Sequence, residues 1–541
     1  MSTSLWGPEL LPAKSAFAIG DEVSVELRGL LPAAGSPVAV EPIAVSLWRH
    51  GELIASVRAD AAVASFGTLP AGRYGVEAHR GDALLARTAI AVGETGMRYG
   101  FVADYRPERD ISAVIDLARR MHLTDMQFYD WAYRHADLNG GGEQYADALG
   151  QPVSLDTVAR LIRELAAVGS RSLGYAAVYA VGNAEREEWS APVLRQADGR
   201  PWMLADFLTI LDPSDPTWLR HFGEDLELAV ERLGFAGFHL DQYGYPKRAR
   251  RSDGTVVDLA EGFATMIAHV RRVLPDARLV FNQVNDFPTW RTGASPQDAV
   301  YVEVWPPHTA LADLGRLTTA SRRHGKPVVI SAYLKPFEGD DLDGADQAAA
   351  LVMATVFSHG GSHLLLGEAD RLLTDPYYVR NHAMRPATAR RLRRWYDFLV
   401  ENGDYLTDQA VVDVTGAYLG DYNGDLLLTY PDHAATWNPQ PGAVWNRVTR
   451  RGDDLVVHLI NLVDQHDTEW DVAKAAARPV SGGRLRVRPE TSDGCSIWLA
   501  DPDGAGRLIE LPTREADGVV EVDLPDLQTW QLVVVRDKHA H

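Results

Sequence analysis

The feature that most constrains the fold is a series of eight short apolar segments between residues 98 and 400. These segments are Gly100–Asp104, Met126–Trp131, Leu173–Tyr179, Gly237–Asp241, Leu279–Gln283, Ala299–Trp305, Pro327–Tyr333 and His363–Gly367. Amphipathic helical patterns lie between them, for example Ser112–Met121, Leu155–Val168, Pro216–Leu233, Ala260–Val273 and Ala345–Phe357. Apolar strands that alternate with helices predict a parallel sheet, and eight such repeats predict a closed (β/α)8 TIM barrel.

An open, doubly wound sheet is the competing interpretation of the same alternation. That fold usually places a glycine-rich phosphate loop directly after its first strand. No such loop follows Gly100–Asp104, where the chain continues as Tyr-Arg-Pro-Glu-Arg. The pattern therefore favours the barrel.

The two flanks of the barrel are predicted to be β-structure. Short alternating runs such as Glu22–Leu27 and Val40–Trp48, separated by turns, predict an immunoglobulin-like sandwich over residues 1–97. Runs such as Asp425–Thr429, Asp454–Ile460 and Thr529–Val535 predict an antiparallel β-domain over residues 405–541. A chain of 541 residues is too long for one hydrophobic core, so we expect three domains, with the barrel at residues 98–404.

Charge and composition limit the partners. The formal net charge of −21 argues against binding to nucleic acid or to anionic membranes, because phosphates would be repelled. No apolar stretch approaches the roughly 20 residues that cross a bilayer, and the first residues lack the pattern of a signal peptide. We therefore expect a cytoplasmic protein. The single cysteine, Cys495, excludes an intrachain disulfide and a cysteine-ligated zinc site. The oligomeric state cannot be deduced from the sequence.

Two carboxylates are the strongest catalytic candidates. Active sites of barrels lie at the carboxyl ends of the strands, and Asp241 and Glu303 each interrupt such an apolar strand end. One buried carboxylate alone can be a strand cap or an ion-pair partner. Two that converge match the pair needed to cleave a glycosidic bond. Apolar neighbours of Glu303 should raise its pKa, which suits the general acid, and the amide of Gln242 beside Asp241 suits an ionised nucleophile. Such chemistry needs no metal and no organic cofactor.

Other polar and aromatic side chains at the same strand ends are candidates for substrate binding. Stacking platforms for sugar rings could come from Tyr129, Trp131, Tyr175, Tyr179, Tyr243 and Trp305, although alternate rings could instead point into the barrel wall. His135 and His239 either bind sugar hydroxyls or are structural. Asp130, Gln242, Asn282 and Glu368 complete the set. The sequence patterns of zinc proteases and of serine esterases are absent.

At these residues the chain resembles glycoside hydrolase family 66, the dextranases and cycloisomaltooligosaccharide glucanotransferases. The resemblance rests on four motifs, Phe128–His135, Gly237–Gly244, Tyr301–Trp305, and His363–Glu368 with Asp375-Pro-Tyr-Tyr378. It extends to the order of the three predicted domains. The resemblance implies a retaining enzyme acting on α-1,6-linked glucans. In the family the aspartate of Asp-Gln-x-Gly, here Asp241, is the nucleophile, and the glutamate of Glu-Val-Trp, here Glu303, is the acid/base.

Two departures from the secreted family members favour hydrolysis of shorter isomalto-oligosaccharides inside the cell. They are the missing signal peptide and the short stretch Leu334–Asp346, which leaves no room for the carbohydrate-binding module inserted in the barrel of cyclising transferases. Three alternatives remain open. The first is transglucosylation to cyclic or elongated products, and the second is a barrel glycosidase of other α-glycoside specificity. The third, a sugar-binding protein without catalysis, is disfavoured because both carboxylates are present.

Overall fold

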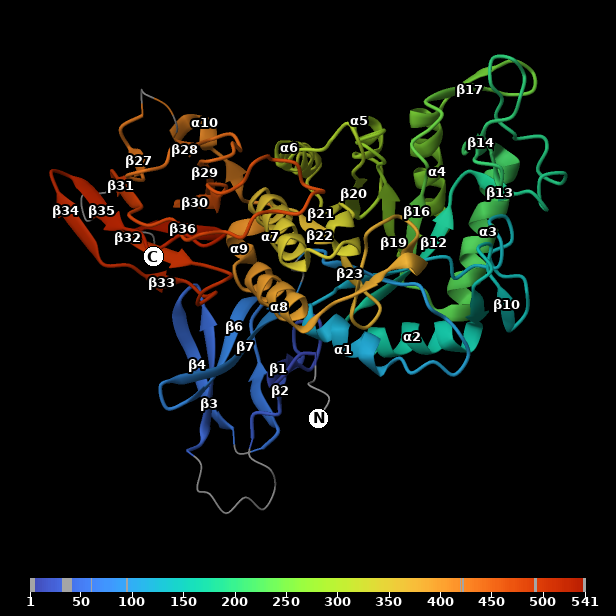
Figure 1. Ribbon diagram of the computed structural model, residues 1–541. Helices are drawn as coiled ribbons and strands as arrows, with labels where there is room; N and C mark the ends of the chain where they lie inside the picture. Colours follow the sequence, from blue (N-terminus) through green and yellow to red (C-terminus); the bar gives the residue numbers. More distant parts are fainter. Residues whose placement is uncertain are drawn as a thin grey trace.

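The computed structural model describes residues 5–31, 41–59, 61–93, 96–418, 420, 423–490 and 494–538. The protein has several domains (Figure 1): a barrel-like domain, a sandwich packed below it in the view, and a β-rich C-terminal domain at its side. The predicted run Val40–Trp48 is the strand β3 (Ile43–Arg49), and its first residue lies outside the described residues.

An eleven-stranded sheet forms the barrel-like domain. Its eight segments are parallel in the order of the chain: β8 (Tyr99–Val102), β9 (Asp125–Phe128), β12 (Arg171–Ala177), β16 (Gly237–Asp241), β19 (Arg278–Asn282), β20 (Ala299–Glu303), β21 (Val328–Ser331) and the pair β22 (Ser362–Leu364) with β23 (Leu366–Gly367). The predicted strand His363–Gly367 is thus split. Its first half pairs with β21 and its second half with β8, so the sheet curls back on its own first strand. Two short antiparallel strands, β24 (Arg371–Leu372) and β25 (His382–Ala383), extend it.

A helix follows each barrel strand. The helices are α1 (Ser112–Arg120), α2 (Leu155–Ala167), α3 (Pro216–Leu233), α4 (Leu259–Val273), the single turn α5 (Thr289–Thr292), α6 (Leu311–Arg322), α7 (Leu342–Ser358) and α8 (Pro386–Glu401). Helix α3 shows why the sequence predicts such boundaries well. The side chain of Asp215 caps the first turn, Pro216 fits the first helical position, and Gly234 takes the left-handed conformation (φ 83°) that ends the helix.

Side chains of the barrel strands divide between the interior of the barrel and the layer under the helices. Rings such as those of Tyr99, Phe101 and Tyr301 fill the interior. Alternate residues such as Phe128 and Phe281 pack outward against the helices. Because successive side chains of a strand point to opposite faces, this alternation decides which strand-end residues can reach the mouth.

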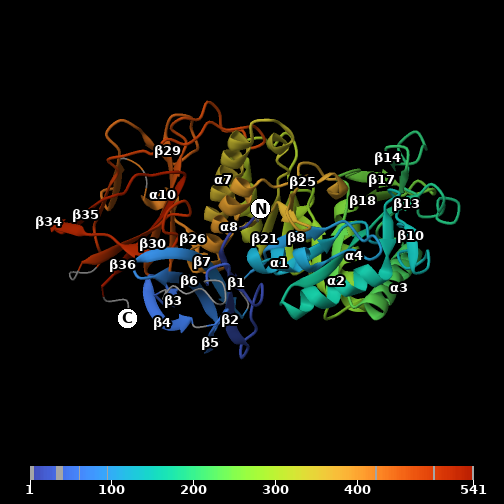
Figure 2. The ribbon, with the colours of Figure 1, turned by 60° about the horizontal axis from the view of Figure 1, so that its bottom comes forward.

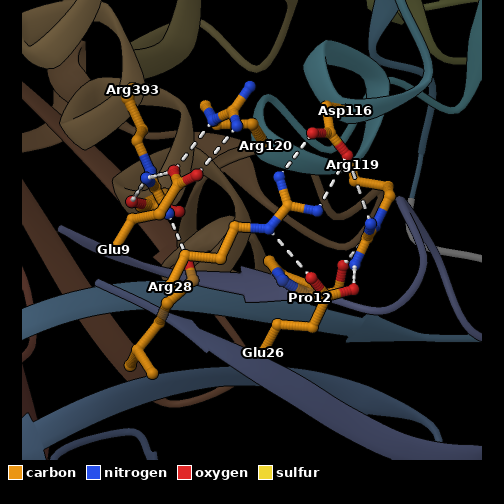
Figure 3. A network of polar contacts seen from close by, with 10 residues as sticks. Glu9, Pro12, Glu26, Arg28, Asp116, Arg119, Arg120 and Arg393 are labelled. Atoms are coloured by element: carbon orange, nitrogen blue, oxygen red, sulfur yellow. Dashed lines mark hydrogen bonds and ion pairs between the residues drawn. The ribbon is translucent and has the colours of Figure 1, made fainter. Parts of the chain in front are cut away.

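The N-terminal sandwich has two antiparallel sheets that share one core. The first contains β1 (Glu9–Pro12), β2 (Glu22–Arg28) and β5 (Val63–Thr68), and the second contains β4 (Glu52–Ala59), β3, β6 (Gly72–Arg80) and β7 (Ala83–Val92). A network of ion pairs joins the sandwich to the barrel helices (Figure 3). The carboxylate of Glu9 accepts two hydrogen bonds of 2.8 Å from Arg120 in α1 and also pairs with Arg393 in α8.

The C-terminal domain contains two sheets around a separate core. One contains β26 (Val412–Asp413), β28 (Ala435–Thr436), β29 (Val444–Arg451), β30 (Asp454–Asn461), β32 (Cys495–Ala500), β33 (Ile509–Glu510) and β36 (Trp530–Asp537). The other contains β27 (Leu426–Thr429), β31 (Arg484–Val487), β34 (Thr513–Ala516) and β35 (Val519–Asp523). All pairs are antiparallel except β28 with β29. The short helix α9 (Gly403–Leu406) precedes these sheets, and the short helix α10 (Thr415–Tyr418) follows their first strand, β26.

Three small hairpin sheets extend from the barrel. Figures 1 and 2 both place β10, β13, β14 and β17 at the end of the molecule opposite the C-terminal domain. Strands β13 (Ala180–Gly182), β14 (Met203–Leu204) and β15 (Leu208–Ile210) form one sheet, β10 (Gln144–Ala146) pairs with β11 (Pro152–Ser154), and β17 (Arg248–Arg250) pairs with β18 (Val256–Asp258). Within the described ranges, no helix is both long and apolar enough to span a membrane.

Candidate active site

Asp241 and Glu303 lie beside each other at the carboxyl ends of β16 and β20. The side-chain amide of Asn282, at the end of β19 between them, donates to both carboxylates, over 2.7 Å to Asp241 Oδ1 and 2.9 Å to Glu303 Oε2. These two oxygens therefore lie no farther apart than the sum of 2.7 and 2.9 Å, which is 5.6 Å.

Each carboxylate has a second hydrogen bond from a tyrosine. Tyr175 on β12 donates its hydroxyl to Asp241 Oδ2 over 2.8 Å, and Tyr333 after β21 donates to Glu303 Oε1 over 2.9 Å. Side chains from three neighbouring strand ends, those of β12, β19 and β21, thus hold the pair. Because each strand is fixed in the barrel sheet by pairing on both sides, the two carboxylates are oriented before any ligand arrives.

The two carboxyl groups differ in electrostatic setting. Burial raises the pKa of Glu303, and the negative charge of Asp241 raises it further. Burial also raises the pKa of Asp241, but the hydrogen bonds from Asn282, Tyr175 and the backbone of Gln242 oppose that rise. At a pH between the two pKa values, Asp241 is ionised and Glu303 is protonated, which is the division of roles that acid catalysis with a nucleophile requires.

A cavity of about 270 Å³ opens in front of the pair. Eleven of the residues predicted for the site line it, namely the catalytic pair with Tyr129, Asp130, His135, Tyr175, His239, Gln242, Tyr243, Asn282 and Trp305. The side chain of Gln242 stabilises the cavity wall. It donates to the carbonyl groups of Asn282 and Phe287 and accepts from the backbone amide of Gly244.

Three predicted substrate-binding residues lie outside this cavity. Trp131 and Tyr179 belong to the core under the helices. Both lie beyond the last residues of β9 and β12, where the alternation of the strand no longer sets the direction of a side chain. The indole of Trp131 donates to the carbonyl of Tyr175 over 3.1 Å, and the hydroxyl of Tyr179 donates to the carbonyl of Tyr245 over 2.6 Å. Both are structural, which corrects the expectation from sequence.

Glu368 is the third of these corrections. It has a positive φ of 54° that turns its side chain toward the end of β8. There its carboxylate accepts from the backbone amides of Ala103 and Asp104 and forms an ion pair with Arg109. A carboxylate with these partners closes the seam between the last and first barrel strands instead of contacting a ligand.

The two histidines and Asp130 add neutral polar groups to the cavity wall. Burial lowers the pKa of His239 to about 3, and burial together with the charge of Arg134 lowers that of His135 to about 4. Burial and the charges of Asp147 and Asp241 raise the pKa of Asp130 to about 8. At neutral pH these three groups are therefore uncharged. Each can donate a hydrogen bond to a sugar hydroxyl and accept one from it.

Several lining residues were not predicted. Tyr333 and Tyr378 are the most important, because Tyr333 contacts Glu303 and the ring of Tyr378 stacks on Tyr129 with centroids 4.5 Å apart. The end of the seventh predicted strand could have indicated Tyr333. Leu204 and Phe207 also line the cavity, but they come from the hairpin region of β14, for which the sequence carries no periodic signal.

Among the described residues, no three His, Cys, Asp or Glu side chains are grouped so that they could hold a metal ion.

Comparisons with known proteins agree with this architecture. The model of glycosyl hydrolase family 66 matches residues 74–534. Two cycloisomaltooligosaccharide glucanotransferase sequences from Niallia circulans are 25% and 24% identical over 49% and 82% of this chain, and 30% and 62% of their own lengths. A dextranase from Streptococcus salivarius is 23% identical over 38% of this chain and 30% of its own length. The chain thus spans less than two thirds of each of these relatives.

A solved structure has the same fold. It is a cycloisomaltooligosaccharide glucanotransferase of Paenibacillus sp. complexed with cycloisomaltoheptaose, with a TM-score of 0.84 and 18% identity over 97% of this chain and 99% of that chain. The family model, the fold and the carboxylate pair together define a glycoside hydrolase. More closely, the chain belongs to glycosyl hydrolase family 66.

Proposed function

We propose that this protein is a retaining enzyme that hydrolyses the α-1,6-glucosidic bonds of dextran or isomalto-oligosaccharides by double displacement. The observation that carries the proposal is the pair of carboxylates bridged by Asn282, with oxygens no more than 5.6 Å apart. Retaining glycosidases have a carboxyl separation of about 5–5.5 Å, whereas inverting enzymes need about 6.5–9.5 Å to admit a water molecule.

In the first step Asp241 attacks the anomeric carbon while protonated Glu303 gives its proton to the leaving glycosidic oxygen. This step forms a glycosyl-enzyme ester and releases the leaving-group sugar. In the second step ionised Glu303 takes a proton from water, the water oxygen attacks the anomeric carbon, and Asp241 leaves as a carboxylate. Both steps invert the anomeric carbon, so the net configuration is retained. The carboxyl groups alone supply the acid, base and nucleophile.

The finer domain assignment belongs to the same proposal. We assign residues 98–404 to a (β/α)8 TIM barrel, residues 1–97 to an immunoglobulin-like sandwich and residues 405–541 to the C-terminal β-domain. The barrel assignment is supported by the alternation of eight strand segments with α1 to α8. The position of the carboxylate pair at the strand ends agrees with the place of active sites in that fold.

The substrate assignment rests on the relatives, which are named as a dextranase and as cycloisomaltooligosaccharide glucanotransferases. The test is to incubate the protein with α-1,6-, α-1,4- and α-1,3-linked glucans and with α-galactosides, and to follow the first-formed anomer by proton NMR. We expect α-anomeric products from the α-1,6 substrates. A first-formed β-anomer would contradict double displacement, and cleavage of another linkage alone would contradict the substrate assignment.

The second candidate is transglucosylation to cyclic or elongated isomalto-oligosaccharides. It is favoured by the shared fold with a glucanotransferase over nearly the whole chain. The chemistry differs only in the second step, where a sugar hydroxyl replaces water. Chromatography of the products at rising substrate concentration distinguishes hydrolysis from transglucosylation. If the protein is a transglucosylase, the share of transfer products should increase relative to that of hydrolysis products.

A further inference from the structure

Four tyrosine rings form a continuous row from one catalytic carboxylate to the other. The ring of Tyr129 lies against that of Tyr175 with centroids 5.4 Å apart and is stacked on Tyr378 at 4.5 Å. The ring of Tyr378 in turn meets that of Tyr333 in an edge-to-face arrangement at 6.2 Å. Aromatic pairs attract one another at these separations. We call these four side chains, Tyr175, Tyr129, Tyr378 and Tyr333, the tyrosine row.

The two ends of the tyrosine row carry the hydroxyl groups that hold the catalytic pair. Tyr175 donates to Asp241 over 2.8 Å, and Tyr333 donates to Glu303 over 2.9 Å. Burial raises the pKa of both tyrosine hydroxyls well above the usual range, so each keeps the proton that it donates. Both hydrogen bonds favour the ionised carboxylate and act to lower its pKa. The orientation of the two end rings thus influences the protonation of both carboxyl groups.

Tyr378 reaches the tyrosine row from a different part of the chain. It begins the helical turn η2 (Tyr378–Arg380) between β24 and β25, whereas the other three rings lie in or just after barrel strands. This segment is fixed by Asp375, whose carboxylate accepts from the backbone amide of Tyr377 over 2.7 Å. It is also joined to the end of β21, where Leu334 donates its backbone amide to the carbonyl of Leu373 over 3.2 Å. The ring of Tyr378 is therefore supported by its own segment.

The ring of Tyr378 contributes more than its hydroxyl does. The side chain is 2% exposed, and its hydroxyl oxygen lies 3.4 Å from Tyr301 Oη and 3.4 Å from Gln127 Oε1. Both distances are longer than those of a normal O–H···O hydrogen bond. The faces and edges of the ring, in contrast, contact Tyr129, Tyr333 and Phe101. Loss of the flat ring should therefore disturb the tyrosine row, whereas loss of the hydroxyl alone should not.

We propose that Tyr378 is a positioning residue for both catalytic carboxylates and acts through the rings of Tyr129 and Tyr333. Without a flat ring at this position, its two neighbours lose a packing surface. The two end hydroxyls then leave the short, aligned geometry on which a strong hydrogen bond depends. The inference rests on the proposed function, because it takes Asp241 as the nucleophile and Glu303 as the acid/base.

The test is the pH profile of kcat/KM on isomaltotetraose. The acid limb reports the ionisation of Asp241, and the alkaline limb reports the loss of the proton from Glu303. In Tyr378→Leu, weaker hydrogen bonds should raise the pKa of both carboxyl groups, so both limbs should move to higher pH. We expect a shift of roughly half a pH unit to one pH unit in each limb, and a roughly tenfold lower maximum. Tyr378→Phe keeps the ring and should leave both limbs in place.

Double variants show whether Tyr378 acts through the end hydroxyls. In the Tyr333→Phe background, Tyr378→Leu should move the alkaline limb much less than it does in the wild-type protein. In the Tyr175→Phe background, it should move the acid limb much less. The reason is that the hydrogen bond through which Tyr378 acts is already absent in each background, so the two changes are not additive.

Tyr396→Leu is the matched control, because Tyr396 is 1% exposed and does not line the catalytic cavity. It removes the same atoms from a buried site, so it should lower the thermal stability to a similar extent while both pH limbs stay in place. If Tyr378→Leu does not fold, Tyr378→Met replaces it, since methionine fills the space without a flat ring. Failure of both variants to fold would mean that Tyr378 is a core residue, and the inference would be wrong.

Two further results would overturn the role of Tyr378. The first is a lower kcat/KM in Tyr378→Leu with both limbs unmoved. The second is a set of limb shifts that persists undiminished in the Tyr333→Phe and Tyr175→Phe backgrounds. A wild-type protein that does not cleave isomaltotetraose at any pH would instead overturn the proposed function.

Discussion

Two buried glutamates in different regions of the molecule have opposite roles. Glu9, in the interface between the sandwich and the barrel, is 4% exposed and surrounded by the guanidinium groups of Arg120 and Arg393. Glu303, at the barrel mouth, is 9% exposed and has an amide, a hydroxyl and another carboxylate as neighbours. The exposed fractions are similar, so burial alone does not distinguish them.

The neighbours decide the protonation state of each group. For Glu9 burial acts to raise the pKa, but the hydrogen bond from Arg120 and the charges of Arg393 and Arg120 outweigh it, and the net pKa is lowered. For Glu303 burial and the charge of Asp241 both act upward, and the net pKa is raised. A carboxylate fixed as an anion stabilises an interface, whereas one that keeps its proton near neutral pH can deliver it.

The largest expected effect is on turnover. Asp241→Ala and Glu303→Gln should each lower kcat/KM by about 10³-fold or more, because each group acts on the transition state, while thermal unfolding should change little. Glu303→Gln should retain activity on substrates with a good leaving group, and azide should then give a product of retained configuration. Asp241→Ala can yield at best the inverted azide. The same anomer from both variants would refute the assigned roles.

The converse effect is expected at Glu9. Glu9→Gln should lower the free energy of unfolding by about 3–5 kcal/mol, because Arg120 and Arg393 would remain buried without their counter-charge. Denaturation in guanidinium chloride measures the change, and turnover at low temperature should be nearly unaffected. If Glu9→Gln destabilised the protein no more than Glu303→Gln does, the claim that Glu9 stabilises the interface and Glu303 does not stabilise the fold would be wrong.

The pH dependence of stability should separate the two groups by sign. Glu9 has a lowered pKa, so its contribution is present above the unfolded value of roughly 4.3 and is lost as the pH falls. Glu303 has a raised pKa, so the folded state is favoured at low pH, and this contribution is lost as the pH rises through the raised pKa. Glu9→Gln should therefore destabilise most at neutral pH, whereas Glu303→Gln should gain relative stability at high pH. Thermal melts from pH 4 to 9 provide the data.

The smallest expected effect concerns Tyr333. Its hydrogen bond favours the ionised form of Glu303 and so lowers the pKa of that carboxyl group. Tyr333→Phe should raise the pKa of Glu303 and shift the alkaline limb of the kcat/KM profile to higher pH, with a loss in rate of roughly tenfold or less. Tyr396→Phe is a suitable control, because that buried hydroxyl donates to the carbonyl of His363 away from the site. A shift toward lower pH in Tyr333→Phe would contradict the role given to this hydroxyl.

The sequence by itself determined the alternation of strands and helices and the positions of the two carboxylates at strand ends. Local signals suffice for this, since Pro216 and Gly234 mark the ends of α3 in the chain itself, and the apolar runs around Asp241 and Glu303 are continuous. In a barrel of parallel strands, side chains at the carboxyl ends converge whatever the details of the loops.

Only the tertiary structure decided which strand-end residues face the cavity. Trp131 and Glu368 have the same local appearance as Tyr129 and Asn282. Trp131 nevertheless packs outward, because it lies beyond the end of β9 and follows the positive φ of Asp130, which breaks the alternation of the strand. A positive φ likewise turns Glu368 toward Arg109. The hydrogen bond that Asp471 accepts from the backbone of Lys335 likewise joins segments 136 residues apart. Such contacts depend on how whole domains pack, and a local pattern in the sequence does not encode that packing.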